Sequence, residues 1–194
     1  VIFRAYDDAC AYRFVSLSDK PFIVKDEQAD FRFPEDRTAY IPYIHKKWKG
    51  SLEEILENDF QCPYTHSLLS EWNERYSIAP LLVECPEGKK VVITEADLMN
   101  YPGMFLYNYK KGNGETLSGY FARVPDKTEI GGHNMVQEKI DSRKDYIAEC
   151  QPFEKFPWRV VAVSSSDKEL TDSDIVWKVA TPAADNDRHG GRPG

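Results

Sequence analysis

Two carboxylate residues stand two positions apart where an apolar stretch ends, in the segment KKVVITEADLMNYPGMFLYNY (89–109). Glu95 and Asp97 follow the run VVIT, and Asn100 and a Tyr-Pro-Gly turn come next. Residues two apart on a strand project to the same side, so the two carboxylates converge if the strand continues through them. Two adjacent oxygen ligands suit calcium, and they also suit a general acid/base pair. The alternative is ordinary structure, in which Asp97 caps the following turn and Glu95 lies in solvent.

The other reactive residue types give no second candidate. The four cysteines, at positions 10, 62, 85 and 150, include no C-x-x-C pair, and the four histidines are scattered, so a zinc site is not indicated. Two disulfides are possible, but free thiols are the simpler interpretation. There is no G-x-S-x-G elbow, and no glycine-rich turn opens a helix after a strand. Nucleophilic catalysis and phosphate binding therefore have little support.

Tryptophan gives candidates for carbohydrate binding, because exposed aromatic rings stack on sugars through their apolar faces. Trp158 and Trp177 lie in apolar, strand-like segments, which predicts that both are core residues. Trp48 and Trp72 stand in loop-like surroundings and are the candidates for exposed, substrate-binding residues. A core or ordinary surface position is the plainer alternative for both.

The composition restricts the class of protein and of partner. The chain has 194 residues, of which 41% are hydrophobic and 29% charged, as in one globular domain with a sizeable core. A formal net charge of -7 argues against a nucleic-acid partner, and no apolar run is long enough to cross a bilayer. The chain begins at Val1 with a strand-like segment, so we expect a piece of a longer protein whose signal peptide, if any, lies in the missing part.

The prevailing hydrophobic period is two, which predicts strands separated by turns, as in an antiparallel sandwich. Pro42 in TAYIPYI predicts an edge strand, because proline cannot donate to a ladder. The segment SLEEILEND (51–59) has a capping box and helical spacing, so it predicts a short helix. The segment 172–180 is the last expected ordered element, and residues 183–194 are expected to be a disordered tail, a linker or an artefact.

Three segments taken together resemble one family. They are RAYDDACAYRF (4–14), APLLVECPEGKKVVITEADLMNYPGMFL (79–106) and PWRVVAVSSSDKELTDSDIVWKVATP (157–182). In this order they resemble the N-terminal domain of glycoside hydrolase family 97, the bacterial α-glucosidases and α-galactosidases typical of gut Bacteroidetes. The central I-T-E-A-x-L-x-x-Y-x-G-M and the later P-W-R-x-x-x-V are the more specific parts.

The resemblance implies an all-β fold, an antiparallel β-super-sandwich similar to galactose mutarotase, with one or two short helices. The domain would span residues 1–182 and be partial, since its opening strands are missing. In the family a catalytic (β/α)8 barrel follows in the same polypeptide and carries the catalytic carboxylates, so this chain alone is expected to be inactive. The implied substrate is an α-linked oligosaccharide, and the implied location is periplasmic or secreted.

The resemblance also separates the two carboxylates. A calcium ion lies in the active site of the family, and one of its ligands is a glutamate of the first domain. The matching position here is Glu95, in ITEADL. Asp97 falls where the family commonly has a small apolar residue, so the resemblance gives it no role.

Two further expectations remain open. The alternative function is a stand-alone carbohydrate-binding or surface interaction module that uses Trp48 and Trp72. If opening strands of the sandwich are missing, the chain exposes an unpaired sheet edge, which predicts self-association.

Overall fold

The computed structural model describes residues 1–44, 56, 61–72, 75–108 and 114–182. These residues form an antiparallel β structure with two short helices, α2 (Asp167–Asp172) and α3 (Ile175–Val179). The strands are β1 (Ile2–Ala5), β2 (Ala9–Arg13), β3 (Phe22–Val24), β4 (Asp30–Arg32), β5 (Thr38–Ile41), β6 (Thr65–Leu68), β7 (Leu81–Glu84), β8 (Lys90–Ala96), β9 (Met104–Tyr107), β10 (Thr116–Phe121), β11 (Pro125–Gly131), β12 (Gln137–Arg143), β13 (Ala148–Cys150) and β14 (Trp158–Ser164). The predicted all-β fold class is confirmed.

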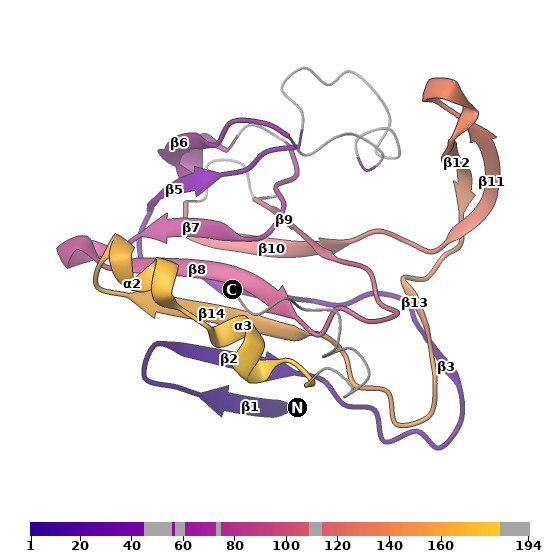
Figure 1. Ribbon diagram of the computed structural model, residues 1–194, viewed down its shortest axis with the longest axis horizontal. Helices are drawn as coiled ribbons and strands as arrows, with labels where there is room; N and C mark the ends of the chain where they lie inside the picture. The colour runs from indigo at the N-terminus through magenta and orange to yellow at the C-terminus, as the bar shows by residue number, and fades with distance from the viewer. Residues whose placement is uncertain (45–55, 57–60, 73–74, 109–113, 183–194) are drawn as a thin grey trace, which may run out of the picture.

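Two sheets pack face to face around the larger core. One has seven strands in the order β1-β2-β14-β8-β7-β5-β6, and the other has the order β4-β10-β9 (Figure 1). Side chains alternate across each strand, so every second residue of β7 to β10 points between the sheets. Leu81, Ile93, Leu106 and Leu117 from these four strands have no exposed surface.

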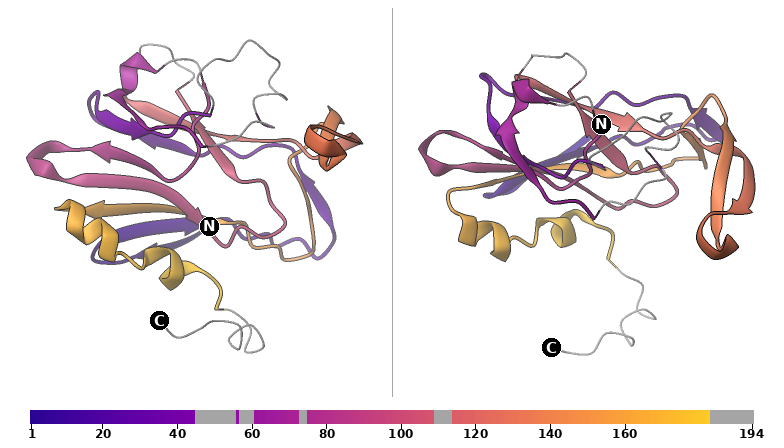
Figure 2. Two further views of the ribbon diagram at one scale, coloured as in Figure 1. Left: turned by 45° about the horizontal axis from the view of Figure 1, so that its top comes forward. Right: turned by 90° about the horizontal axis from the view of Figure 1, so that it is seen from above.

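The two helices lie against the opposite face of the seven-stranded sheet (Figure 2). A smaller core is buried between them and this face. Trp158 and Val160 of β14 pack there against Ile175 and Val179 of α3. Ser166 caps α2, its side chain accepting a hydrogen bond from the backbone N–H of Glu169. The molecule therefore has three layers: the small sheet, the large sheet and the helices.

A long hairpin of β11 and β12 projects from this body (Figures 1 and 2). Nearly every residue of β11 is exposed, and Ile130, Met135 and Val136 present apolar side chains to solvent near the tip. The remaining pair, β13 and β3, forms a two-stranded sheet.

The structure corrects the tryptophan predictions. Trp158 is buried as predicted, but Trp177 is 84% exposed. Trp177 lies in α3 rather than in a strand, and helical spacing turns Ile175 and Val179 inward and Trp177 outward. Trp72 is only 5% exposed, so the expected solvent-facing ring is wrong. Its ring packs edge-to-face on Tyr43 with centroids 5.0 Å apart, and burial of this aromatic pair stabilises the core.

Three other predictions fall partly or wholly outside the described residues. Trp48 lies outside them, as does nearly all of the predicted helix at 51–59. The tail at 183–194 also lies outside them.

The predicted edge strand is wrong, because β5 lies between β7 and β6. Pro42 comes directly after the last residue of β5, so its missing N–H removes no ladder bond. One edge of the large sheet is instead β1, which pairs only with β2 among the described strands and exposes all four of its residues. Self-association through such an edge stays a prediction.

All four cysteines are free thiols in the structure. Cys150 is buried and Cys10 is exposed. Among the described helices, none is long and apolar enough to cross a membrane.

Candidate functional site

Glu95 is the last but one residue of β8 and lies directly opposite Arg159 of β14 in the antiparallel register. Both side chains point to the face of the large sheet that carries the larger core, since each is one residue away from a member of the smaller core. Their meeting is therefore fixed by strand pairing rather than by loop conformation.

Arg159 joins two carboxylates in a buried cluster. Its Nε and Nη2 each donate to one oxygen of Glu27 at 2.8 Å, and its Nη1 donates to Oε2 of Glu95 at 2.6 Å. The guanidinium lies over the Phe121 ring, 4.8 Å from the centroid. The exposed fractions of the side chains are 1% for Arg159, 4% for Glu27 and 14% for Glu95. With both carboxylates ionised, the cluster has one negative charge in excess, and Glu95 is its most accessible member.

The loop between β8 and β9 folds back onto the Glu95 carboxylate. The backbone N–H of Met104 donates to Oε1 at 3.0 Å and to Oε2 at 3.3 Å. A Cβ atom at Gly103 would lie 3.4 Å from Oε1, so glycine keeps space open beside this oxygen. Oε1 thus has a neutral hydrogen-bond donor and retains a lone pair for another partner.

Burial raises the pKa of Glu95 above its ordinary value, and the Met104 N–H and Arg159 oppose this only in part. Glu27 adds to the increase, because a second negative charge lies across the same guanidinium. Ionised Glu95 is therefore an electrostatically costly group, and a cation beside it would relieve that cost.

Asp97 lies on the opposite face of the large sheet, although it is only two residues from Glu95. Its backbone has φ +57°, which breaks the alternation of the strand. Oδ2 accepts from Nη1 of Arg13 at 3.1 Å, and the Arg13 guanidinium stacks on Trp158 of the smaller core. The two carboxylates do not converge, and Glu95 does not lie in solvent. Asp97 has a structural role, as the alternative interpretation expected, but it bonds to Arg13 and Thr181 instead of capping the following turn.

Asp97 also holds the chain after α3. Its Oδ1 accepts from the backbone N–H of Thr181 at 2.7 Å, and Oδ2 accepts from the Thr181 hydroxyl at 2.8 Å. Burial alone would raise the pKa of Asp97, but these bonds and the Arg13 charge outweigh it and hold the pKa below the ordinary value. Asp97 is a structural residue whose charge is balanced by its partners.

Metal binding by the described part of the chain alone is not supported. Within it, no group of three or more His, Cys, Asp or Glu side chains could hold a metal ion. Glu95 could supply one ligand through Oε1, whereas calcium takes six to eight oxygens. A calcium ion at Glu95 would need most of its ligands from elsewhere.

The comparisons with known proteins identify the family. The model of the glycosyl-hydrolase 97 N-terminal family matches residues 1–182. The chain belongs to this family. The retaining alpha-galactosidase of Bacteroides thetaiotaomicron is 39% identical over 195 residues, an alignment that covers 100% of this chain and 29% of that protein. The glycosyl-hydrolase 97 N-terminal chain thus spans less than a third of this curated relative.

Solved structures give the same fold. A variant of a glycoside hydrolase family 97 enzyme from Pseudoalteromonas sp. strain K8 has a TM-score of 0.65 at 16% identity, covering 93% of this chain and 23% of that one. A beta-arabinopyranosidase has a TM-score of 0.66 at 19% identity, covering 94% of this chain and 28% of that one. The predicted resemblance is confirmed, and the described β-sandwich corresponds to one part of the longer proteins that it matches.

Sequence reasoning singled out Glu95 but missed the residues around it. Glu27 and Arg159 are 132 positions apart, and no local pattern links them. The P-W-R motif contained a usable signal, because an arginine inside an otherwise apolar strand must find a buried carboxylate. Glu27, in a polar loop, gives no such signal.

Proposed function

We propose that this chain is the non-catalytic N-terminal β-sandwich of a calcium-dependent, exo-acting α-glycosidase. In that enzyme it would support a following (β/α)8 barrel, form part of the active-site pocket and donate Glu95 to the calcium ion. The family match over residues 1–182 and the far greater length of the relative support a further domain in the same polypeptide. The 39% identity to a retaining alpha-galactosidase favours an α-linked galactoside among the possible oligosaccharide substrates.

The excess negative charge of the Glu27–Arg159–Glu95 cluster is the observation that carries the role of Glu95. Arg159 is neutralised by the bidentate contact with Glu27, so Glu95 has a charge left for another cation. Its Oε1 has only the Met104 N–H as a partner among the described residues and lies beside the space left at Gly103. Calcium bound there would supply Lewis-acid chemistry and position the substrate. Arg159 and Met104 would hold the carboxylate in one orientation.

The test is a Glu95→Gln substitution in the complete enzyme, with Asp97→Asn as the matched control. Both changes replace a carboxylate by its amide, and the two positions are only two residues apart. We expect Glu95→Gln to weaken calcium binding at least about tenfold, since one anionic ligand is lost, and to lower turnover. Asp97→Asn removes no proposed ligand, so it should weaken calcium binding much less than Glu95→Gln does. Titration calorimetry of the metal-free enzymes measures the affinity, and unchanged affinity and turnover in Glu95→Gln would overturn the assigned role.

A further inference from the structure

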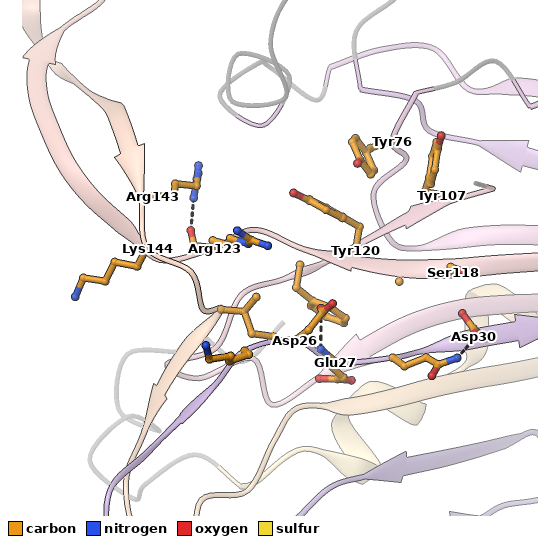
Figure 3. A pocket seen from close by; sticks show the side chains of 15 residues that line it. Asp26, Glu27, Asp30, Tyr76, Tyr107, Ser118, Tyr120, Arg123, Arg143 and Lys144 are labelled. Atoms are coloured by element: carbon orange, nitrogen blue, oxygen red, sulfur yellow. Dashed lines mark hydrogen bonds between the residues drawn. The ribbon is translucent and has the colours of Figure 1, made fainter. Parts of the chain in front are cut away.

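A cleft with a volume of about 840 Å³ lies beside the small sheet (Figure 3). One wall comes from β10, from Tyr76 in the segment before β7 and from Tyr107 at the end of β9. The other comes from the loop between β3 and β4 and from the segment that follows β12. Its size is in the range of small-ligand sites, and of its lining only Glu27 and Phe121 also contact Arg159 in the Glu95 cluster.

Three tyrosines form the aromatic end of the cleft. The ring of Tyr76 lies 4.6 Å from that of Tyr120 and 5.1 Å from that of Tyr107, measured between centroids. Each ring is only partly buried, and the three side chains group at one end of the cavity in Figure 3. Tyrosine presents an apolar face with a polar edge, so this wall can stack on a flat apolar surface and bond polar groups at its rim.

Polar groups with unused hydrogen-bonding capacity line the rest of the cleft. Ser118 is nine-tenths buried, and its hydroxyl has no hydrogen-bond partner among the described residues. Asp30 accepts one bond from the Gln28 amide, at 2.7 Å, through Oδ2. The side chain of Arg123 makes no hydrogen bond or ion pair within the described ranges, and Figure 3 shows it on the cleft side of β10. A buried polar group without a partner costs stability, so a ligand that supplies partners would offset that cost.

We infer that this cleft binds a pyranose unit of a glycan. The ring would stack on Tyr120, and its hydroxyls would bond to Ser118, Asp30 and Arg123, which together offer both donors and acceptors. A purely apolar ligand would leave these groups unpaired. The lining combines four basic residues (Lys25, Arg123, Arg143 and Lys144) with three acidic ones (Asp26, Glu27 and Asp30), so its charges nearly balance. A neutral ligand with several hydroxyl groups therefore fits this cleft better than a strongly charged one.

The experiment uses the complete enzyme in native affinity electrophoresis, with galactomannan, soluble starch or polygalacturonate cast in the gel. These three polymers include neutral and acidic glycans. The choice of the two neutral polymers, which carry α-linked sugars, rests on the proposed function. At least one polymer should retard the wild-type protein. Tyr120→Ala should raise the apparent dissociation constant about tenfold, because the stacking surface is lost.

Two variants keep the test specific. Tyr120→Trp retains an aromatic face and should restore retardation. Tyr64→Ala removes a tyrosine that is 57% exposed and does not line the cleft, so it should behave as wild type. Absence of retardation by every polymer, or equal retardation of Tyr120→Ala and wild type, would overturn the inference.

Activity on a small aryl α-galactoside separates this inference from the proposed function. Tyr120→Ala should keep the kcat/KM of wild type on this substrate, which also shows that the variant is folded. If the wild-type enzyme had no activity on this substrate or on the matching aryl α-glucoside, the proposed function would fail while the electrophoresis still reported on the cleft. Circular dichroism would then check the folding of each variant.

Discussion

Glu95 and Asp97 stand two residues apart and each bonds to an arginine and a backbone N–H, yet the balance of charge around them differs. Glu95 shares one guanidinium with Glu27 and keeps an excess of negative charge. Asp97 has its own arginine and two bonds from Thr181. Burial raises the pKa of Glu95, whereas the bonds to Asp97 outweigh burial and lower its pKa. Glu95 can therefore accept a further ligand, whereas the oxygens of Asp97 are occupied by contacts that stabilise the fold.

The difference arises from a single backbone torsion. Strand alternation would place both side chains on one face, but φ +57° at Asp97 sends its side chain to the helix-covered face. Spacing in a sequence therefore predicts a shared site only as far as the strand itself continues, and β8 ends at Ala96.

Replacement of Arg159, the arginine that bonds to Glu95, should have the largest effect on the free energy of unfolding. Arg159→Met keeps the apolar volume but leaves two buried carboxylates facing each other, so we expect a loss of about 3–5 kcal/mol in the free energy of unfolding. Urea denaturation measures it. Arg32→Met is the control, because its ion pair with Glu115 is exposed and should cost less than about 1 kcal/mol. Similar losses for the two variants would contradict the buried cluster.

The same amide substitution at the two carboxylates should have an intermediate and unequal effect. At neutral pH without calcium, we expect Asp97→Asn to lower the free energy of unfolding by about 2 kcal/mol, because charge-assisted bonds are lost. Glu95→Gln should cost less than half as much, since an amide oxygen still accepts from Met104 and the burial of a charge is avoided. Equal losses at neutral pH would be evidence against unequal charge balance.

The pH dependence of these losses should have opposite signs. Asp97 has a folded pKa below its ordinary 3.8, so its contribution is present above that pH and disappears as the pH falls through the folded value. Glu95 has a folded pKa above 4.5, so the stability that its protonated form gives is lost as the pH rises through that value. Denaturation curves in chelator from acid to neutral pH, compared with those of each amide variant, would reveal both slopes. Slopes of the same sign would refute the assignment.

The smallest change tests the link between Asp97 and the chain after α3. Thr181→Val keeps the shape and the backbone N–H but removes the hydroxyl that donates to Oδ2. A loss of about 1 kcal/mol in the free energy of unfolding is expected, measured by urea denaturation. Thr171→Val is a suitable control, because that hydroxyl is exposed and bonds only locally to the Lys168 carbonyl.

Local pattern was enough to predict the fold class, because period-two alternation follows directly from strand geometry. It failed where the position of an element in the whole molecule decides. Trp177 looks like a core residue in an apolar run, and only the helical conformation of the segment turns it outward. Pro42 suggests an edge strand, but β5 ends one residue earlier, so this proline does not interrupt the hydrogen bonds of the sheet.

The candidate site could be predicted in part. Glu95 was marked by its family motif, whereas its partners come from segments remote in the sequence. The cleft tyrosines were missed for the same reason, since Tyr76, Tyr107 and Tyr120 meet only after β9 and β10 pair. Alternating aromatics in FLYNY were the available signal, and they indicate one aromatic face rather than a cavity.

The bond between Asp97 and Thr181 has a consequence for chain entropy. It fixes the point where the chain leaves the sandwich two residues along from Glu95, on the other face of the same sheet. The entropy cost of closing a loop grows with the length of the loop. A following segment that packs near Glu95 therefore loses less conformational entropy when it starts from this anchored residue than when it starts from an unanchored helix end. Under the proposed function, Asp97 would raise the effective concentration of the remaining calcium ligands around Glu95 without touching the ion.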